Sequence, residues 1–428
     1  MTSLNAKESG KMKRVYQIFS GTQKDLFKQV VDHIGYFESL HVTDIWFTPF
    51  IESPSYHSYD CTDFFKIKEE IGAMKEFEEM CEALHEHEIG VMFDLVPCHV
   101  SNQHRWFSNH PEYFIWSNEK RGTQKAYGNL DQSSENAWHW SEEHQKYYYA
   151  PFSQCMPSLN LDNEEVREML VFIAKFWMNK GVDSFRLDAI IHSHLNMNDS
   201  VKFFEWFREQ VPVYMVGEAW SDYYTIGRYS NVIDSCFDFP LQGSLIWSTR
   251  NLDFLGIAGD LNRTYSNLTL FTSNHDMDRV GEVLGHDEEK IKLYLWLNLL
   301  FAQGQHCLYH MDEVGIGGTK CIDDINVRPQ IDWDLICKQM FAPDSILREY
   351  LRAVRLIDKY EVLSDGKIVR VECQYEYQRF AIYKELEDGT RVKIKVQPSN
   401  KNLDKAYTVA SFCGHDIVIA MHQPVSIQ

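Results

Sequence analysis

The feature that most constrains this fold is a repeated alternation of short apolar segments with segments of helical periodicity. In the helical segments, apolar residues recur at intervals of three and four, as on a helix with one buried face. Eight strands are predicted: Val15–Phe19, Ile45–Thr48, Val91–Val96, Val182–Ala189, Tyr214–Glu218, Val232–Phe239, Thr269–Ser273 and Cys307–His310. Continuous apolar strands in β–α units predict a parallel sheet covered on both faces, and eight units predict a closed (β/α)8 TIM barrel of the α/β class.

The alternation is interrupted once and ends before the last residues of the chain. Residues 99–161 are rich in His, Trp, Tyr, Asn and Ser and are too long for a simple connection, so we expect an inserted lobe after the third strand. After a helix that ends near Tyr360, four strands without helices predict a small antiparallel β domain: Lys367–Glu372, Phe380–Lys384, Arg391–Val396 and Ile417–Ile419. The expected parts are 1–98 and 162–360 for the barrel, 99–161 for the lobe and 361–428 for the C-terminal domain.

Charge and cysteine usage exclude several classes of partner. A net charge of −20 argues against nucleic acid and against an anionic membrane, and suits a neutral substrate. The ten cysteines form no C-x-x-C pair and no regular framework, which predicts neither a zinc site nor a disulfide scaffold. The polar start, Met1 to Arg14, lacks the apolar run of a signal peptide. These features predict a cytoplasmic protein with reduced thiols.

Ionisable side chains gather at the predicted strand ends, where the active sites of such barrels lie. They are Asp94, His99, Arg186, Asp188, His192, Glu218, His275 and Asp276. Taken singly, an Asp after a strand is explained by a helix N-cap, and a lone His by a structural hydrogen bond. Taken together they indicate a carboxylate active site, with glycoside hydrolysis as the leading chemistry. That reaction needs two opposed carboxyl groups, one to protonate the leaving oxygen and one to meet the developing oxocarbenium ion.

At these residues the sequence resembles the α-amylase family, family 13 of the glycoside hydrolases. Four segments resemble its motifs in order and spacing: Asp94-Leu-Val-Pro-Cys-His99, Gly181-Val-Asp-Ser-Phe-Arg-Leu-Asp188-Ala-Ile-Ile-His192, Val216-Gly-Glu218-Ala-Trp and Phe271-Thr-Ser-Asn-His-Asp276. Met156-Pro-Ser-Leu-Asn-Leu-Asp-Asn163 is similar to an additional motif after the lobe. The match runs from about Val15 to Tyr360.

The resemblance implies retaining hydrolysis of α-1,4-glucosidic bonds in malto-oligosaccharides through a covalent glucosyl-enzyme intermediate. It implies that Asp188 is the nucleophile, Glu218 the general acid and base, and Asp276 the residue that stabilises the transition state. Glu218 must then begin protonated, with a raised pKa, whereas Asp188 must stay ionised, which the neighbouring Arg186 would favour.

The resemblance also implies residues that bind the substrate. Arg186, His99, His192 and His275 would line the cleavage subsite, and Tyr59 in Tyr56-His-Ser-Tyr-Asp60 would stack on the sugar ring. Asp60 and Arg328 resemble a pair that closes around a terminal glucose. Simple packing of Tyr59 and a structural salt bridge between Asp60 and Arg328 remain open alternatives.

Several positions depart from the family pattern. Cys98 stands where the first motif usually has asparagine, and Asn160 where calcium-binding members have aspartate. A thiol is a poor ligand for calcium, so we expect no metal there and no cofactor. Ser158 replaces a common aspartate, without a consequence that we can state. Ile191, in place of a lysine, weakens the case for a long cleft on the leaving-group side, and Ala189 resembles members that prefer α-1,4 bonds.

Three alternatives remain. A transglycosylase, such as a 4-α-glucanotransferase, or an α-1,6-glucosidase would use the same intermediate, because residues of the acceptor site decide its fate. A catalytically inactive carbohydrate-binding member would usually lack one of the acids, and all three are present. A barrel enzyme of unrelated chemistry, such as an aldolase, would need a Schiff-base lysine or metal ligands. The sequence does not decide between endo and exo attack, nor the oligomeric state.

Overall fold

The centre of the computed structural model is an eight-stranded parallel sheet, and the structure describes residues 12–121, 137–320, 324–399 and 408–422. The strand order is β11-β10-β9-β5-β2-β1-β13-β12. The strands are β1 (Lys13–Ile18), β2 (Asp44–Phe47), β5 (Gly90–Leu95), β9 (Ser184–Leu187), β10 (Tyr214–Gly217), β11 (Ser235–Cys236), β12 (Leu270–Phe271) and β13 (Gln305–Tyr309). A parallel bridge between Phe237 and Thr269 joins the two edge strands, so the sheet closes into a barrel.

The barrel interior is a separate apolar cluster, because alternate residues of each strand point towards the axis. Its members come from seven of the eight strands or the residues that follow them: Val15, Trp46, Met92, Val216, Phe237, Phe239, Phe271 and Cys307. On β9, the residues in register with Met92 and Asp94 are Ser184 and Arg186. The β9 side of the interior is therefore polar, and it carries a charge at the C-terminal end.

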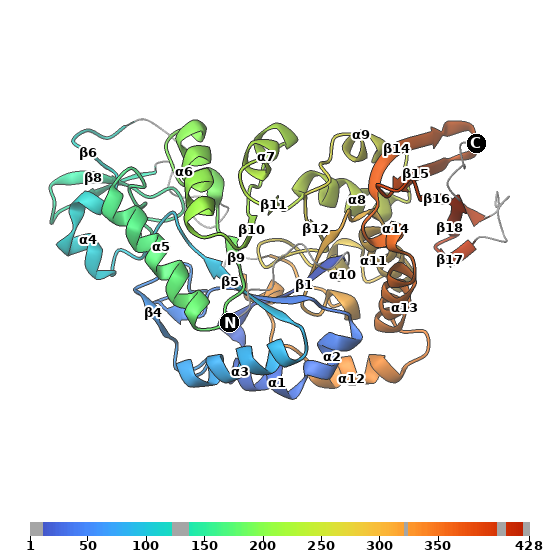
Figure 1. Ribbon diagram of the computed structural model, residues 1–428, viewed down its shortest axis with the longest axis horizontal. Coiled ribbons are helices and arrows are strands. Elements are labelled where there is room, and N and C mark those ends of the chain that lie inside the picture. Colours follow the sequence, from blue (N-terminus) through green and yellow to red (C-terminus); the bar gives the residue numbers. More distant parts are fainter. Residues whose placement is uncertain (1–11, 122–136, 321–323, 400–407, 423–428) are drawn as a thin grey trace.

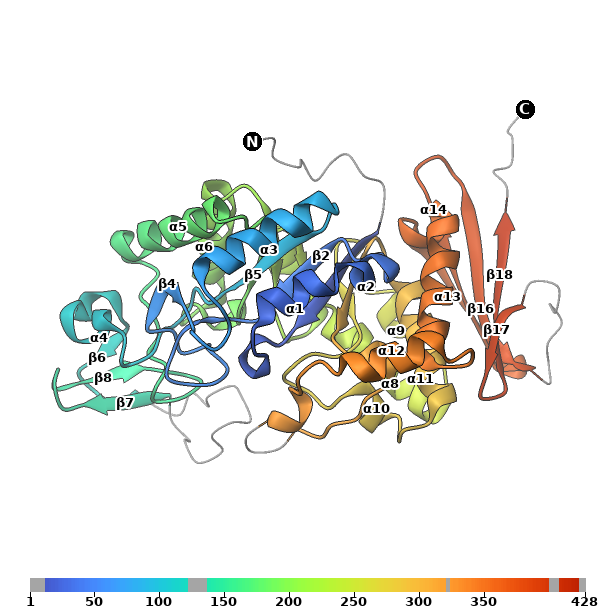
Figure 2. The same cartoon turned by 90° about the horizontal axis from the view of Figure 1, so that it is seen from below.

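Helices cover the outside of the barrel (Figures 1 and 2). They are α1 (Leu26–Asp32), α2 (Ile34–Ser39), α3 (Met74–Glu86), α5 (Glu164–Asn179), α6 (Met197–Gln210), α7 (Tyr223–Ser230), α8 (Phe239–Asn251), α9 (Ala258–Leu261), α10 (Val280–Val283), α11 (Glu288–Phe301), α12 (Trp333–Phe341), α13 (Ile346–Lys359) and α14 (Glu361–Ser364). Every residue of α11 from Ile291 onwards is buried. This helix is apolar on all sides because α8, α13, β12 and the C-terminal sheet all contact it.

A lobe projects from the barrel between β5 and β9, at the left of Figure 1. It contains α4 (Arg105–Asn109) and a three-stranded sheet of order β6-β8-β7, formed by Trp116–Ser117, Lys146–Tyr149 and Trp138–Ser141. A hairpin of β3 (Ile51–Glu52) and β4 (Asp63–Ile67) lies after β2. Residues 122–136 of the expected lobe lie outside the described residues.

The C-terminal domain is a five-stranded antiparallel sheet of order β14-β15-β16-β18-β17. Its strands are β14 (Lys367–Gln374), β15 (Arg379–Glu385), β16 (Arg391–Pro398), β17 (Thr408–Phe412) and β18 (His415–His422). Lys384 joins it to the barrel: the buried ammonium donates to the carbonyl of Ala302 at 2.6 Å and to that of Leu363. Burial lowers the pKa of Lys384 to about 7.

The predicted architecture is confirmed: a TIM barrel with a lobe after the third strand and a C-terminal β domain. The domain boundaries stay predictions, and residues 1–11 of the first part are not described. Several elements differ from expectation. Apolar residues at intervals of three and four from Phe27 to Leu40 predict one helix, but the structure breaks it at His33, whose ring stacks on Trp333 with centroids 3.6 Å apart. The strand β17 was not predicted, and β11 is only two residues long.

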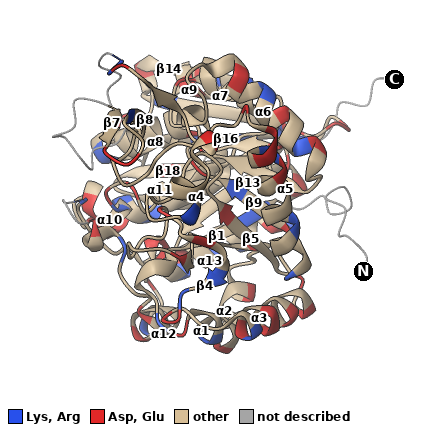
Figure 3. Ribbon diagram, turned by 90° about the vertical axis from the view of Figure 1, so that its left-hand side faces the viewer, with Lys and Arg blue, Asp and Glu red and all other residues tan. Residues whose placement is uncertain are grey.

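Acidic and basic residues are interspersed along the outer helices, for example on α3 and α5 (Figure 3). Among the described residues, no helix is long and apolar enough to cross a membrane.

Candidate active site

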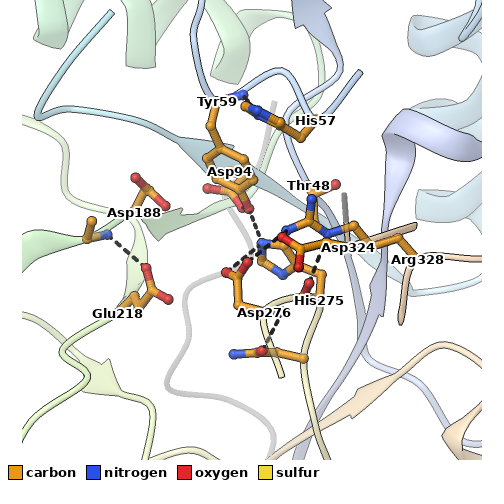
Figure 4. Close-up of polar contacts among 12 residues, drawn as sticks. Thr48, His57, Tyr59, Asp94, Asp188, Glu218, His275, Asp276, Asp324 and Arg328 are labelled. Carbon is orange, nitrogen blue, oxygen red and sulfur yellow. Dashed lines mark hydrogen bonds and ion pairs between the residues drawn. The ribbon is translucent and has the colours of Figure 1, made fainter. Parts of the chain in front are cut away.

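The three expected catalytic acids lie at one rim of the barrel, each on a segment that leaves the C-terminal end of a strand (Figure 4). Asp188 directly follows β9, Glu218 directly follows β10, and Asp276 lies on the loop after β12. β9 and β10 are neighbours in the sheet, with Leu187 in register with Gly217. The strand order therefore brings Asp188 and Glu218 side by side.

Arg186 holds three carboxylates at once. Its Nη1 donates to Asp94 Oδ1 at 2.8 Å and to Asp188 Oδ1 at 2.7 Å, and its Nη2 lies 2.8 Å from Glu218 Oε2. The Arg186 side chain is 1% exposed, and its guanidinium also lies 5.1 Å from the ring of Trp46. A charge buried this deeply needs such compensation, so the four side chains form one electrostatic unit.

Asp188 and Glu218 have similar electrostatic environments. Burial raises the pKa of Asp188 to about 7 and that of Glu218 to about 7, while Arg186 opposes the rise for both. The expectation of a raised pKa for Glu218 agrees with this. Arg186 favours the ionised form of Asp188, as expected, but burial outweighs this effect because three carboxylates share the one guanidinium. Near neutral pH the two carboxyls titrate as a pair.

Glu218 is held in place by the backbone after Asp188. Ala189 adopts a left-handed conformation with φ 46°, and its N–H donates to Glu218 Oε2 at 3.1 Å. Below it, the buried thiol of Cys98 lies 3.5 Å from the carbonyl oxygen of Asp188 and 3.6 Å from that of Ala189. Both Oε2 contacts leave Glu218 Oε1 as the oxygen available to a ligand.

Asp276 is fixed from the side opposite Glu218. Arg328 Nη2 donates to its Oδ1 at 2.8 Å, and His275 Nε2 lies 3.2 Å from its Oδ2. Burial raises the pKa of Asp276, but His275, Arg328 and Lys320 outweigh burial and hold that pKa well below its usual range. Asp276 is therefore ionised across the physiological range of pH.

A chain of hydrogen bonds fixes Tyr59 and His275. Gln17 Nε2 lies 2.8 Å from His275 Nδ1, and His275 Nε2 lies 2.7 Å from the Tyr59 hydroxyl. The hydroxyl donates in turn to Asp94 Oδ2 at 3.1 Å. If the Gln17 amide donates to Nδ1, the His275 proton is on Nε2, which faces the site. Burial lowers the pKa of His275 to about 3, so the ring is neutral.

His99 and His192 both contact Phe152, a residue of the lobe. The ring of Phe152 is 5.2 Å from that of His99 and 5.1 Å from that of His192. Both nitrogens of His99 are buried without a good hydrogen bond to a described residue. Burial lowers the pKa of His99 to about 4, so a neutral imidazole here could bind a hydroxyl group of a ligand.

The structure does not join Asp60 and Arg328 in an ion pair. Asp60 accepts hydrogen bonds from Ser53 at 2.6 Å and from Ser55, both in its own loop. Arg328 donates to Tyr56 Oη at 2.7 Å and to the carbonyl of His275 at 2.9 Å, besides Asp276. Asp324, which lies 3.4 Å from Arg328, is a closer acidic partner than the expected Asp60. A structural salt bridge between Asp60 and Arg328 is therefore not formed, whereas their expected role around a terminal glucose stays a prediction.

The residues at the position of the family's calcium site do not fit calcium. The Cys98 thiol faces two backbone carbonyls, and Asn160 Oδ1 accepts the N–H of Asp162 at 3.2 Å. Among the described residues there is no group of three or more His, Cys, Asp or Glu side chains arranged to hold a metal.

Sequence reasoning missed several residues of this site. Gln17 orients His275, Trp46 Nε1 donates to Asp94 Oδ2 at 3.0 Å, and Asp324 contacts Arg328. Gln17 had a usable signal, since it is a lone amide within an otherwise apolar strand. Asp324 and Trp46 gave no such signal, because only the folded chain brings them to the rim.

Comparisons with known proteins agree with this geometry. A family model described as "Alpha amylase, catalytic domain" matches residues 20–350. Alpha-amylase 3 of Dictyoglomus thermophilum is 32% identical over 406 residues, covering 84% of this chain and 78% of that protein. A 4-alpha-glucanotransferase of Thermotoga neapolitana is 29% identical over 305 residues, covering 68% of each. The crystal structure of an alpha-amylase from H.orenii superposes with a TM-score of 0.82 at 25% identity, covering 96% of this chain and 97% of that one.

Proposed function

This chain belongs to the α-amylase family of glycoside hydrolases, and from that premise we propose that it hydrolyses α-1,4-glucosidic bonds of malto-oligosaccharides with retention of configuration. The observation that carries the proposal is the shared contact of Asp188 and Glu218 with Arg186. This contact supports the proposal, because retaining hydrolysis requires two carboxyl groups close together, one as nucleophile and one as acid and base.

In the first step, Asp188 Oδ2 attacks the anomeric carbon while Glu218 gives its proton to the glycosidic oxygen. The bond to the leaving sugar breaks as the ester to Asp188 forms. Asp188 Oδ1 already accepts a hydrogen bond from Arg186, which orients the carboxylate. We assign the shared proton of the pair to Glu218, since the third motif of the family contains its acid at this position and Oε1 is free to donate.

In the second step, Glu218 removes a proton from water, and the water oxygen attacks the anomeric carbon. The ester to Asp188 breaks, and the released sugar has the α configuration. The ionised Asp276 lies across the rim and stabilises the positive charge that develops on the sugar in both transition states. Its contact with Arg328 fixes its orientation without neutralising it.

Tyr59, His275 and His99 are proposed to bind the sugar at the cleavage subsite. The Tyr59 and His275 rings are fixed by the hydrogen bonds that lead from Gln17 to Asp94. His99 offers two ring nitrogens that lack a good partner among the described residues. Preorganised polar groups of this kind are worth more than mobile ones, because they lose little entropy on binding.

The direct test is product analysis with maltose, maltoheptaose and isomaltose, with the anomeric form followed by NMR. We expect α-anomeric products from the two α-1,4 substrates and little turnover of isomaltose. Initial release of the β-anomer would refute retention. Preferential cleavage of isomaltose would instead identify an α-1,6-glucosidase.

A second candidate function is glucosyl transfer. The relative from Thermotoga neapolitana is named as a 4-alpha-glucanotransferase, and the same covalent intermediate serves both reactions. Incubation with maltotriose separates the two, since a transferase forms longer oligosaccharides before glucose accumulates.

We further propose that the protein acts in the cytoplasm on maltodextrins. The nine described cysteines are all free, which suits a reducing compartment. Labelling of intact cells with a thiol reagent that does not cross membranes should leave the protein unmodified if this location is correct.

A further inference from the structure

Lys320 is a cation at the rim of the site that the proposed catalytic steps leave without a role. It lies on the segment after β13, and its side chain is 20% exposed. Its Nζ donates to the main-chain carbonyl of Asp276 at 2.8 Å and lies 3.8 Å from the Oδ1 of the same residue. The short contact of Lys320 is therefore with the backbone of Asp276, and the ion pair with its carboxylate is the longer contact.

The segment that carries Lys320 is joined to the loop of Asp276 at further points. The N–H of Lys320 donates to Asp278 Oδ1 at 2.6 Å, and the N–H of Arg279 donates to the carbonyl of Gly318 at 3.0 Å. The two segments also approach closely at Gly281, where a Cβ would meet two backbone carbonyl oxygens of the segment after β13 at 2.4 and 2.5 Å. The lysine is therefore presented from a support that is itself fixed to the loop of Asp276.

The side chain and the main chain of Asp276 are held by different residues. Arg328 Nη2 donates to the carboxylate Oδ1 at 2.8 Å and orients the side chain (Figure 4). The N–H of Asp276 donates to Asn274 Oδ1 at 2.8 Å, and its C=O accepts the hydrogen bond from Lys320. An aspartate side chain is short, so the place of its carboxylate depends directly on where its backbone lies.

The positive charge of Lys320 does not by itself explain a benefit to catalysis. Exposed ion pairs are weak because water screens them, and Arg328 already binds the same oxygen of Asp276 at a shorter distance. A second cation beside Asp276 would also weaken the attraction between that carboxylate and a positively charged transition state. The directed hydrogen bond to the main chain has no such cost, and a displacement of about 1 Å in a catalytic group can lower a rate by about 100-fold.

We propose that Lys320 is a positioning residue, which fixes the main chain of Asp276 so that its carboxylate faces the positive charge of the transition state. The inference rests on the proposed retaining hydrolysis of α-glucans. Lys320 acts through Asp276 and does not contact the reacting atoms. Because the contact of Asp276 with the sugar strengthens in the transition state, loss of Lys320 lowers kcat and leaves KM nearly unchanged.

The first test replaces the donor of Lys320 and measures the two kinetic constants separately. Lys320→Met keeps a long side chain without a donor, and its kcat on α-maltosyl fluoride should fall by about tenfold, with KM within about twofold of the wild type. Lys320→Arg keeps a donor and should retain kcat within about threefold. A kcat of Lys320→Met that stays within twofold of the wild type would overturn the proposal, as would an equal loss in Lys320→Arg.

A double-mutant cycle shows whether Lys320 acts through Asp276. In protein that carries Asp276→Ala, no carboxylate remains to be positioned, so adding Lys320→Met should lower kcat on the fluoride by less than about twofold. A purely structural role of Lys320 would instead lower kcat by the same factor in both backgrounds, and that result would refute the proposal.

Lys180 provides the matched control. Its side chain is 29% exposed, and its Nζ lies 2.6 Å from Glu78 Oε1, where it joins the outer helices α5 and α3. Lys180→Met should leave kcat and KM unchanged. Wild-type protein that cleaves neither maltotriose nor the fluoride would overturn the proposed function together with this inference. An active wild type with an equally active Lys320→Met variant would overturn the inference alone.

Discussion

The hydroxyl of Tyr59 lies 2.7 Å from Nε2 of His275, and the two rings are inclined by only 2°. Tyr59 comes from the loop that joins β3 to β4, and His275 comes from the loop after β12. Because Asp94 and Gln17 hold the two ends of this contact, it fixes two loops across the barrel rim. The surface that a sugar would meet is therefore set before a ligand arrives.

Removal of the Tyr59 hydroxyl should lower catalytic activity strongly and thermal stability only a little. In Tyr59→Phe, His275 Nε2 and Asp94 Oδ2 each lose a partner, and we expect kcat/KM on maltotriose to fall by about 10- to 100-fold. Tyr113→Phe is a matched control, since that hydroxyl donates at 2.8 Å to Glu165, outside the site. The Tyr113→Phe control should have an equal or lower melting temperature but the kcat/KM of the wild type. Equal activity of the two variants would contradict the role of Tyr59.

Loss of Asp188 should make Glu218 more acidic. The negative charge of Asp188 is among the causes that raise the pKa of Glu218 to about 7, so Asp188→Asn should lower that pKa. An NMR titration of protein labelled with ¹³C at the glutamate carboxyls measures it directly. A pKa of Glu218 that stays near 7 in the variant would show that burial alone sets it.

The pH dependence of kcat/KM in the wild type follows from the ionisation of Asp188 and Glu218. On the acid side, activity should be lost as Asp188 gains a proton, and on the alkaline side as the pair loses its last proton. With both pKa values at about 7, we expect a narrow bell centred near neutrality for kcat/KM. A flat plateau between pH 5 and 9 would contradict the coupling.

Asp276→Asn should abolish most turnover while sparing the fold. The amide keeps the shape but cannot stabilise a cationic transition state, so kcat should fall by about 10²- to 10³-fold. Lys320 and Arg328 would then face an uncharged group, and thermal melting should change little because Asp276 is partly exposed. Near-normal turnover would exclude Asp276 from the mechanism.

The buried carboxyl of Glu313 should make the free energy of unfolding depend on pH, independently of catalysis. Its Oε1 accepts from Tyr16 at 2.8 Å and from Tyr36 at 2.5 Å, while Oε2 has no partner among the described residues. Burial raises its pKa from 4.5 to about 7. The folded state therefore binds this proton more tightly than the unfolded state does. The stabilisation that the protonated Glu313 contributes is lost as the pH rises from about 4.5 through 7.

The test for Glu313 is Glu313→Gln, which removes the ionisation. The free energy of unfolding should depend less on pH between 5 and 8 than in the wild type, by up to about 3 kcal/mol over the range. Denaturant titrations at several pH values measure this slope. An unchanged slope would show that the carboxyl is ionised in the folded protein at pH 5.

Cys98 should be inert to thiol reagents in the folded protein. Burial raises its pKa well above the usual value, and its thiol faces the carbonyls of Asp188 and Ala189. The exposed Cys155 and Cys337 should react quickly with a disulfide reagent, without loss of activity. Cys98→Val, which removes the donor at similar volume, should lower kcat severalfold, since it releases the segment whose N–H holds Glu218.

The barrel could be predicted from the sequence, because apolar strand segments and helical periodicity are local patterns that repeat along the chain. The helical periodicity after the lobe predicts a helix from about Glu164 to Asn179 that ends at Gly181, and α5 has these bounds, with Asn163 as its N-cap. The break at His33 has no local signal in the sequence, and the Trp333 ring that stacks on His33 is distant in sequence. The strand β17 is short, and Ala410 and Ser411 gave it little apolar signal.

For the site, the strand ends predicted which residues meet but not how they pair. Asp188, Glu218, Arg186, His275 and Asp276 were all identified in the sequence, and the structure brings them to one rim. A direct salt bridge between Asp60 and Arg328, one of the two readings that the sequence left open, is absent because local hydroxyl groups bind Asp60 instead. The similar pKa values of Asp188 and Glu218 also escaped prediction, since they depend on how many carboxylates share one guanidinium.

The closure of the barrel between β11 and β12 has a consequence for how the site moves. Only two backbone hydrogen bonds among the described residues cross this seam, Thr269 N to Cys236 O at 2.9 Å and Asp238 N to Thr269 O at 3.0 Å. Glu218 and Asp276 lie on opposite sides of it. Their separation is governed by the packing of Phe237 against Phe271 rather than by a long ladder. Local opening of the backbone should therefore occur mainly between β11 and β12, next to the proposed catalytic acids. Backbone amides of β11 and β12 should exchange hydrogen sooner than those of β1 and β2.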